Sequence, residues 1–321
     1  MTTPKFPAFR TGKRRHEQGT FTPVPNGAQI PYAILEASEP GPVLLITAGV
    51  HGSEVSSIEA ALRLMRLAPC HILKGTLIIL PILNISGFRA RSIYIMPEDG
   101  KNLNRQFPGT ADGSASQRLA FWLAEEMLPA CDAYLDLHGG DLDEDLRPFV
   151  ISNKGHEPSR ELALASGFDT VVDGFGARPV ASACAAGMGI PALTIEAGHN
   201  GVWSEESVSL HYNAVMRIMA YLRIAKEPSI AEPSIAEPSK PSPPRTVELF
   251  VPVASVSGFW YPRQAVGALV TPGAVLGEIK DAFGVMLSTI RSEVSGDVLY
   301  QLTSLCVNEG EQLLGVAHSA Q

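Results

Sequence analysis

Two kinds of apolar pattern alternate along the first two thirds of the chain. Short continuous apolar runs are typical of strands buried on both faces, and they occur at residues 42–47, 76–83, 133–137, 149–152, 170–172 and 192–195. Segments with apolar residues every three or four positions indicate amphipathic helices, and they cover residues 53–68, 114–127, 159–166 and 204–224. This alternation predicts an α/β fold whose mostly parallel sheet has helices on both faces.

Two further stretches of this region have weaker patterns. Residues 1–26 are interpreted as a loosely held lead-in, and residues 30–35 as an edge strand, because Pro31 has no N–H to donate to a ladder. Residues 84–113 show little periodicity and are rich in Arg, Asn, Gly and Pro. Irregular stretches of this length are uncommon in compact domains and often carry function.

The composition changes after the last of these helices. Residues 227–240 repeat a Glu-Pro-Ser-Ile-Ala unit, which cannot build a core and predicts a semi-rigid linker. We therefore expect a large α/β domain at 1–225, a linker at 226–245 and a small all-β domain at 246–321. The last resembles barrel-sandwich domains of the biotinyl and lipoyl type. Lys280 lacks the methionine neighbour of their cofactor-carrying lysine, so the domain is expected to pack against or shield a site.

Composition narrows the classes of function. The 321 residues are 45% hydrophobic with a formal charge of −8, which favours a globular protein and argues against a nucleic-acid partner. No apolar run approaches the roughly 20 residues that span a bilayer, so no membrane partner is expected. The four cysteines form no Cys-x-x-Cys pair, which indicates a reducing compartment. We expect a soluble cytoplasmic protein, with the oligomeric state left open, a homo-oligomer included.

The candidate chemistry starts at the turn after the second predicted strand. His51 and Glu54 lie in the segment Gly-Val-His-Gly-Ser-Glu, where a buried strand becomes a helix. Ligands bind beyond the carboxyl ends of strands in open α/β sheets, and this imidazole and carboxylate could both bind one zinc ion. A His-x-x-Glu alone could equally be a helix start with an acid in its first turn.

His138 supplies a third ligand. It ends the strand at 133–137 and precedes two glycines, although it could also be an ordinary strand-end histidine. A His/Glu/His set leaves a fourth zinc position open for water, as in catalytic sites. Asp136 is interpreted as a residue that supports His138 or caps the turn.

Glu196 and the long irregular stretch complete the predicted site. Glu196 ends an apolar strand, and its carboxylate could accept a proton from the attacking water, unless it simply emerges into solvent. Arg105 could bind a carboxylate with both of its terminal nitrogens. Arg89 and Arg91 lie upstream, and Arg89 is expected to pair with a surface acid. One of these arginines could hold a substrate carboxylate, and another could stabilise the oxyanion of a tetrahedral intermediate.

Together these motifs resemble the succinylglutamate desuccinylase/aspartoacylase family, a branch of the zinc carboxypeptidase clan. The resemblance covers roughly residues 40–225 and rests on segments 49–54, 84–88, 102–109, 136–140 and 190–198. Asn102 stands where many members have aspartate, which is similar to the deacylase-like branch. The resemblance implies His51, Glu54 and His138 as ligands of one Zn²⁺ and Glu196 as general base and acid. It also implies that Asn104 and Arg105 bind the substrate carboxylate, and that Arg91 polarises the scissile carbonyl.

The sequence therefore predicts a zinc-dependent hydrolase that cleaves the amide bond of an N-acyl amino acid. Two other functions stay open. A metallocarboxypeptidase acting on short or unusual peptides would use the same residues, and a non-catalytic binding or assembly module would use the β-domain as its surface. The acyl group and the amino acid cannot be predicted from these motifs.

Overall fold

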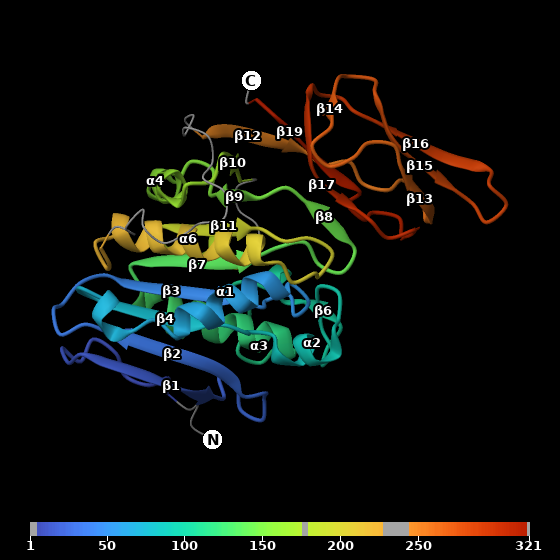
Figure 1. Cartoon of the computed structure of the whole chain (residues 1–321). Helices are drawn as coiled ribbons and strands as arrows, with labels where there is room; N and C mark the ends of the chain where they lie inside the picture. Colours follow the sequence, from blue (N-terminus) through green and yellow to red (C-terminus); the bar gives the residue numbers. More distant parts are fainter. Residues whose placement is uncertain (1–4, 175–178, 227–243, 320–321) are drawn as a thin grey trace.

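The computed structural model describes residues 5–174, 179–226 and 244–319. Its main feature is a 13-stranded mixed sheet that runs from the N-terminal strand into the last part of the chain (Figure 1). A separate antiparallel sheet of four strands lies beside it. These two sheets and their helices confirm the predicted fold class. No helix in the described ranges combines the length and apolar character that crossing a bilayer requires.

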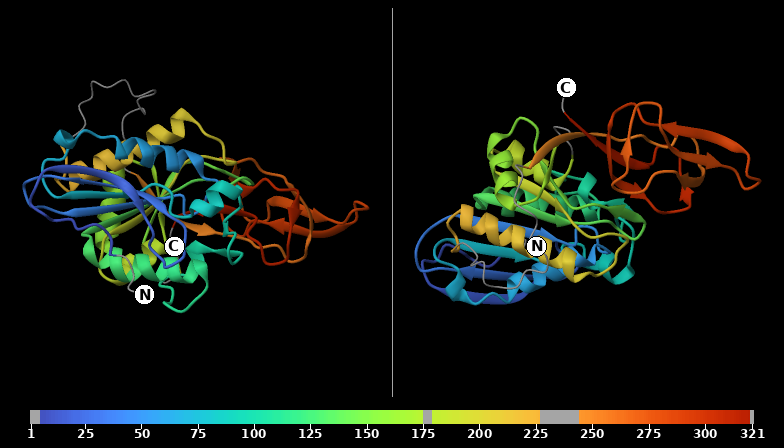
Figure 2. Two further views of the ribbon diagram at one scale, coloured as in Figure 1. Left: turned by 90° about the horizontal axis from the view of Figure 1, so that it is seen from below. Right: turned by 45° about the horizontal axis from the view of Figure 1, so that its top comes forward.

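Four parallel strands form the centre of the large sheet. In spatial order they are β4 (Thr76–Leu80), β3 (Val43–Ala48), β7 (Ala133–His138) and β11 (Ala192–Glu196). Nearly all their residues are buried, because helices cover both faces. Figures 1 and 2 show α1 (Val55–Met65) and α6 (Glu205–Tyr221) on one face and α3 (Ala115–Trp122) on the other. The carboxyl ends of the four strands therefore meet at one edge, as the alternation predicts.

The prediction of an edge strand at residues 30–35 is wrong. β2 (Ile30–Glu36) lies between β4 and β1 (Arg15–Phe21), and it is antiparallel to both. Pro31 is tolerated there because β4 pairs only with Ala33–Glu36 of β2. The prediction that residues 1–26 form a loosely held lead-in is also wrong for β1. Its sequence is polar and partly exposed, yet it forms the edge strand of the sheet.

On the other side, the sheet continues beyond β11. β9 (Phe149–Ser152) is antiparallel to β11, β10 (Thr170–Asp173) is parallel to β9, and β12 (Arg245–Phe250) is parallel to β10. The path then passes through β19 (Leu314–His318), β17 (Gly296–Leu302) and β14 (Leu269–Val270), and β8 (Glu144–Leu146) pairs with β17. The first and last thirds of the chain thus share one sheet.

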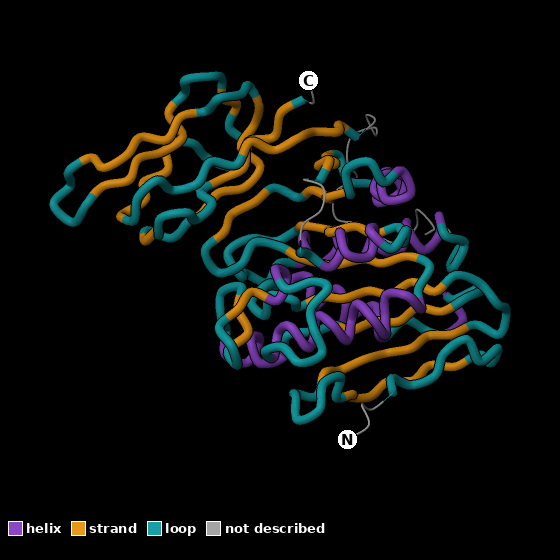
Figure 3. The backbone as a smooth tube through the Cα atoms, turned by 180° about the vertical axis from the view of Figure 1, so that it is seen from behind, coloured by secondary structure: helices purple, strands orange, loops and turns teal. Residues whose placement is uncertain are grey.

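The smaller sheet contains β16 (Met286–Arg291), β15 (Val275–Lys280), β13 (Gly258–Pro262) and β18 (Cys306–Val307). It packs with β17 and β19 around a core of its own that includes Trp260, Leu276 and Val316. Figure 3 shows these strands and their loops as a lobe without helices. The repeat at 227–240 lies outside the described residues, so the domain boundaries remain predictions.

The remaining elements are short and lie between the main strands. The long irregular stretch holds α2 (Ile85–Ala90), β5 (Ile95–Met96), β6 (Lys101–Asn102) and the 3-10 turn η2 (Leu103–Arg105). Elsewhere lie the helices α4 (Glu157–Ser166) and α5 (Ala181–Gly187), the 3-10 turns η1 (Pro69–His71) and η4 (Leu128–Ala130), and the short π-helix η3 (Leu123–Met127). Ser204 caps α6 through the N–H of Ser207, which confirms the expected start of that helix.

Candidate active site

The turn between β3 and α1 brings His51 and Glu54 to the carboxyl edge of the sheet. Gly49 has a φ of +59°, which glycine adopts without strain. Gly52 lies so close to α2 that a Cβ there would be 2.0 Å from the backbone nitrogen of Phe88. The glycines are therefore required by this sharp turn, as the sequence suggests.

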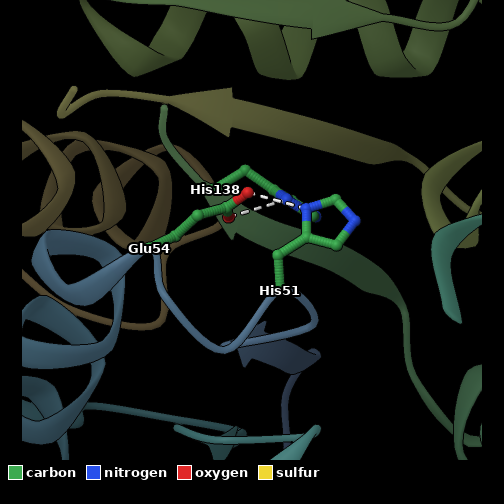
Figure 4. A group of neighbouring side chains, drawn as sticks. All are labelled: His51, Glu54 and His138. Carbon is green, nitrogen blue, oxygen red and sulfur yellow. Dashed lines mark hydrogen bonds and ion pairs between the residues drawn. The ribbon is translucent and has the colours of Figure 1, made fainter. Parts of the chain in front are cut away.

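Three buried side chains from two strand ends form a compact group at this edge (Figure 4). Nδ1 of His51 lies 2.6 Å from Oε1 of Glu54, and Nδ1 of His138 lies 3.0 Å from Oε2 of the same carboxylate. The ligand atoms of all three residues lie within 4.8 Å of one another. The structure thus brings together the three residues that sequence reasoning proposed as metal ligands.

The outer nitrogens of both imidazoles are held by oxygen atoms. Nε2 of His51 lies 3.2 Å from Oδ1 of Asn102, and Nε2 of His138 lies 3.0 Å from Oδ2 of Asp136. Asp136 is fully buried and accepts a hydrogen bond of 2.6 Å from the Thr47 hydroxyl. These acceptors favour protons on both Nε2 atoms, so the Nδ1 atoms are the ones that face the carboxylate of Glu54. The Nδ1 lone pairs and the carboxylate would repel one another without a proton or a metal ion between them, so this donor set fits one metal ion.

The local charges agree with this arrangement. Burial raises the pKa of Glu54, but His138 and His51 lower it more, to about 2. Burial opposes protonation of His138, yet Asp136 and Glu54 hold its pKa well above the ordinary value. The group is therefore arranged to keep a carboxylate ionised next to positive charge.

Glu196 lies beside the three residues, as predicted from its strand. It ends β11 and pairs with His138 of β7 in the sheet register. Burial, assisted by the charges of Glu54 and Asp136, raises the pKa of Glu196 to about 8, against the opposing effects of His138 and Arg105. A carboxyl group with this pKa can exchange a proton near neutral pH.

The predicted substrate-binding residues have different positions. Asn104 is buried, and its Oδ1 accepts from the N–H of Ala181 at 2.9 Å. Arg105 is exposed, donates to the carbonyl of Asn104 and lines the same cavity as the three buried ligands. Arg91 is also exposed, at the C-cap of α2, and is not among the described residues that line this cavity. Its contact with a scissile carbonyl stays a prediction.

All the predicted ligand, catalytic and substrate-binding residues except Arg91 line one cavity of about 800 Å³, which we call the central cavity. One part of its wall consists of His51, Glu54, Asn104, Arg105, His138 and Glu196. Another part comes from the end of the chain and includes Leu249, Tyr300, Leu302 and Glu311. The volume is suited to a small molecule, and residues from the last quarter of the chain complete the wall.

Sequence reasoning missed two residues of this wall. Tyr94 has a φ of +56°, which is rare for an aromatic residue, and its ring packs edge to face against His51 at 5.1 Å. Its hydroxyl donates to Oε2 of Glu144 at 3.1 Å. Burial and the charges of Glu196 and Glu54 raise the pKa of Glu144 well above the ordinary value. The acid-rich run at 141–145, just after the histidine of β7, is the one sequence feature that points to this part of the wall.

Comparisons with known proteins find similar sequences and similar folds. The model of the succinylglutamate desuccinylase/aspartoacylase catalytic domain matches residues 40–222. Among curated proteins, an N-alpha-acetyl-L-2,4-diaminobutyric acid deacetylase from Halomonas elongata is 36% identical over 124 residues. That alignment covers 39% of this chain and 36% of the relative, so the match spans about a third of the relative's length.

Solved structures share the fold over almost the whole chain. A succinylglutamate desuccinylase/aspartoacylase from Rhodobacter sphaeroides has 23% identity and a TM-score of 0.81, covering 98% of this chain and 99% of that one. The product-bound ectoine utilization protein EutE from Ruegeria pomeroyi has 22% identity and a TM-score of 0.83, covering 99% and 100%. The likeness extends through the C-terminal strands.

Proposed function

Because the chain belongs to the succinylglutamate desuccinylase/aspartoacylase family of metal-dependent amidohydrolases, we propose that it hydrolyses the amide bond of a small N-acyl amino acid. The observation that carries the proposal is the buried His51, Glu54 and His138 group, which opens into the same cavity as Glu196 and Arg105. The partial match to a deacetylase of an acetylated amino acid supports a short acyl group.

In this proposal His51, Glu54 and His138 hold one metal ion, for which zinc is typical in the family. Two imidazole nitrogens and one carboxylate leave a position open on zinc, as in catalytic sites. When bound, zinc polarises a carbonyl group and lowers the pKa of water. Asp136 and Asn102 keep the outer nitrogens of the histidines protonated and so orient the inner ones.

Glu196 is proposed as the group that moves the proton. Its carboxylate accepts a proton from the attacking water and then donates that proton to the nitrogen of the departing amine. Its position beside His138 in the β7–β11 register supports this role. An ordinary, solvated glutamate would return the proton less readily, whereas burial raises the pKa of Glu196 to about 8.

Asn104 and Arg105 are proposed to bind the carboxylate of the substrate. A guanidinium can donate two parallel hydrogen bonds to a carboxylate, which fixes the orientation of a small substrate. The N–H of Ala181 donates a hydrogen bond to the side-chain oxygen of Asn104, and this bond fixes the orientation of the Asn104 amide group. The C-terminal residues of the wall are proposed to narrow the cavity and thereby to favour small substrates.

The test is amine release from N-acetyl and N-succinyl amino acids and from short peptides, with and without a chelator. Chelator-sensitive release from an acyl amino acid is the expected result. Release from peptides alone would instead favour the exopeptidase function. The Glu196→Gln variant should keep its metal but lose at least about 100-fold in kcat. Full turnover by this variant, with metal content measured as unchanged, would contradict the proposed proton transfer.

A further inference from the structure

One part of the wall of the central cavity has no role in the proposed reaction. It is apolar, and its residues are Leu146, Phe149, Ile151, Leu249 and Tyr300. They come from β8, β9, β12 and β17, where the central strands of the large sheet continue into the C-terminal lobe (Figure 1). Ile151, Leu249 and Tyr300 are only partly buried, so part of each side chain faces the cavity. We call this part of the wall the apolar surface.

The sheet register places the apolar surface directly beside the reacting groups. His138 pairs with Glu196 across β7 and β11, and Glu196 pairs in turn with Phe149 across β11 and β9. Side chains of paired residues lie on the same face of a sheet, and in an antiparallel pair their Cβ atoms are about 4.5–5.5 Å apart. Thr194 and Ile151 form the next row on this face. The apolar surface therefore begins one strand beyond Glu196, on the side away from His138.

The described residues of the apolar surface offer no partner to a charged side chain, because they carry no carboxylate, amine or guanidinium group. The cavity wall also holds Asp143 and Glu311, which lie outside the four strands of this surface, and Glu144, which begins β8. Burial and the charges of Glu196 and Glu54 raise the pKa of Glu144 well above the ordinary value, so its carboxyl group is a poor partner for a cation. A charged group placed on this surface would lose its hydration without gaining an ion pair, whereas an apolar group gains from leaving water.

The order of these groups across the sheet decides which part of a substrate meets the apolar surface. In the proposed reaction the amide carbonyl lies on the side of the metal ligands, and Glu196 donates a proton to the departing amine. Glu196 stands between His138 and Phe149 in the sheet. The amine nitrogen and the carbon atoms attached to it therefore lie toward Phe149, and the acyl group stays on the other side. Because Arg105 is proposed to bind the carboxylate, the side chain of the amino acid is the group that remains for the apolar surface.

We propose that the substrate is an N-acyl amino acid with an apolar side chain, and that Phe149, Ile151 and Leu249 select it by removing that side chain from water. This inference rests on the proposed function, because it assigns the substrate class of the same site. A cavity of about 800 Å³ has room for such a side chain beside the acyl group and the carboxylate. The assigned class differs from the substrate named for the deacetylase relative, a diaminobutyric acid that carries a second amine.

The test compares three acetylated amino acids of similar size by kcat/KM. They are Nα-acetylleucine with an apolar side chain, Nα-acetylasparagine with a neutral polar one of the same branched shape, and Nα-acetyl-2,4-diaminobutyrate with a cationic one. The wild-type protein should prefer the leucine substrate over both others by roughly 10-fold to 100-fold, as expected when a side chain of this size leaves water. Ile151→Ala truncates the apolar surface and should lower the ratio of the leucine to the asparagine substrate by roughly 3-fold to 30-fold.

Val150→Ala is the matched control for this substitution. Val150 neighbours Ile151 on β9 but packs in the core on the opposite face of the sheet, so its truncation should leave the ratio unchanged. Leu249→Ala tests the apolar surface from β12, a different part of the chain, and should lower the ratio as well.

Three results would count against the inference in different ways. Equal kcat/KM for the leucine and asparagine substrates, or a preference for the diaminobutyrate, would overturn it and leave the proposed function standing. Equal losses on the leucine and asparagine substrates in both Ile151→Ala and Leu249→Ala would also overturn it. Hydrolysis of none of the three by the zinc-loaded protein would refute the proposed function and the inference with it.

Discussion

Replacing Asp136 by asparagine should loosen the metal ion from the site. The Thr47 hydroxyl donates to Oδ1 of Asp136 at 2.6 Å, so an asparagine would keep its oxygen on that side. Its NH₂ group would then face Nε2 of His138, where the carboxylate oxygen now lies at 3.0 Å. The Asn104 amide nitrogen, 3.4 Å from the same atom, would also donate to it. Nε2 must then become an acceptor, and the proton of His138 moves to Nδ1, the nitrogen that faces Glu54.

The size of the effect follows from this one tautomer change. A metal ion that binds Nδ1 must displace the proton there, and the proton returns to Nε2. The N–H of Nε2 then faces the two side-chain amide donors at positions 136 and 104, so the variant loses about one charge-assisted hydrogen bond. Changes of this kind weaken metal binding by roughly 10-fold to 100-fold, or about 1.4–2.7 kcal/mol. Competition with a chromophoric chelator at fixed pH would measure the zinc dissociation constant of both proteins.

The matched control is Asp132→Asn at the opposite end of the same strand. Asp132 accepts from Arg10 and from the N–H of Val43, both at 2.8 Å, and it lies outside the cavity wall. This variant should lose some stability and no zinc affinity. If Asp136→Asn bound zinc as tightly as the wild-type protein, the reasoning about the tautomer of His138 would be refuted.

Three further predictions concern other parts of the molecule. Arg91→Ala should lower kcat by about 100-fold or more if this arginine polarises the scissile carbonyl, and an unchanged kcat would remove it from the site. Gly52→Ala should lower the free energy of unfolding, measured by urea titration, by about 1–3 kcal/mol or more, because its Cβ would overlap the backbone of α2. Gly187→Ala is the control: its Cβ would meet open space, so this variant should be neutral or stabilising in the same titration. Arg245 lowers the pKa of Asp297 in the folded protein through two hydrogen bonds. The free energy of unfolding lost in Asp297→Asn should therefore be largest at pH values well above the ordinary aspartate pKa of about 3.9, and the loss should disappear as the pH falls through the lowered pKa of the folded state.

The metal ligands could be predicted because they depend on a general property of parallel sheets. His51 and His138 each follow a continuous apolar run, and such strands end at the same edge. Glu196 follows a third run, and the register places it directly beside His138. In these cases the local pattern and the global fold carry the same information.

The rest of the site depends on contacts that no local pattern contains. Glu144 belongs to a strand of three residues whose partner, β17, lies more than a hundred positions later in the chain. The positive φ of Tyr94 is imposed by its tertiary contacts with Asp141 and His51, and a tyrosine has no preference for it. β1 was missed for a related reason, since an edge strand with a polar, partly exposed sequence lacks the apolar run of a buried strand.

The sharing of one sheet by both ends of the chain has a mechanical consequence. β12 is hydrogen-bonded to β10 over three register pairs, and β8 is hydrogen-bonded to β17 over three more. A hinge-like swing of the C-terminal lobe would have to break these main-chain hydrogen bonds, which leaves backbone groups without their partners. The width of the cavity mouth is therefore set when the protein folds. Substrate entry and product exit have to proceed through an aperture of fixed width, and turnover is not expected to wait for a domain to open.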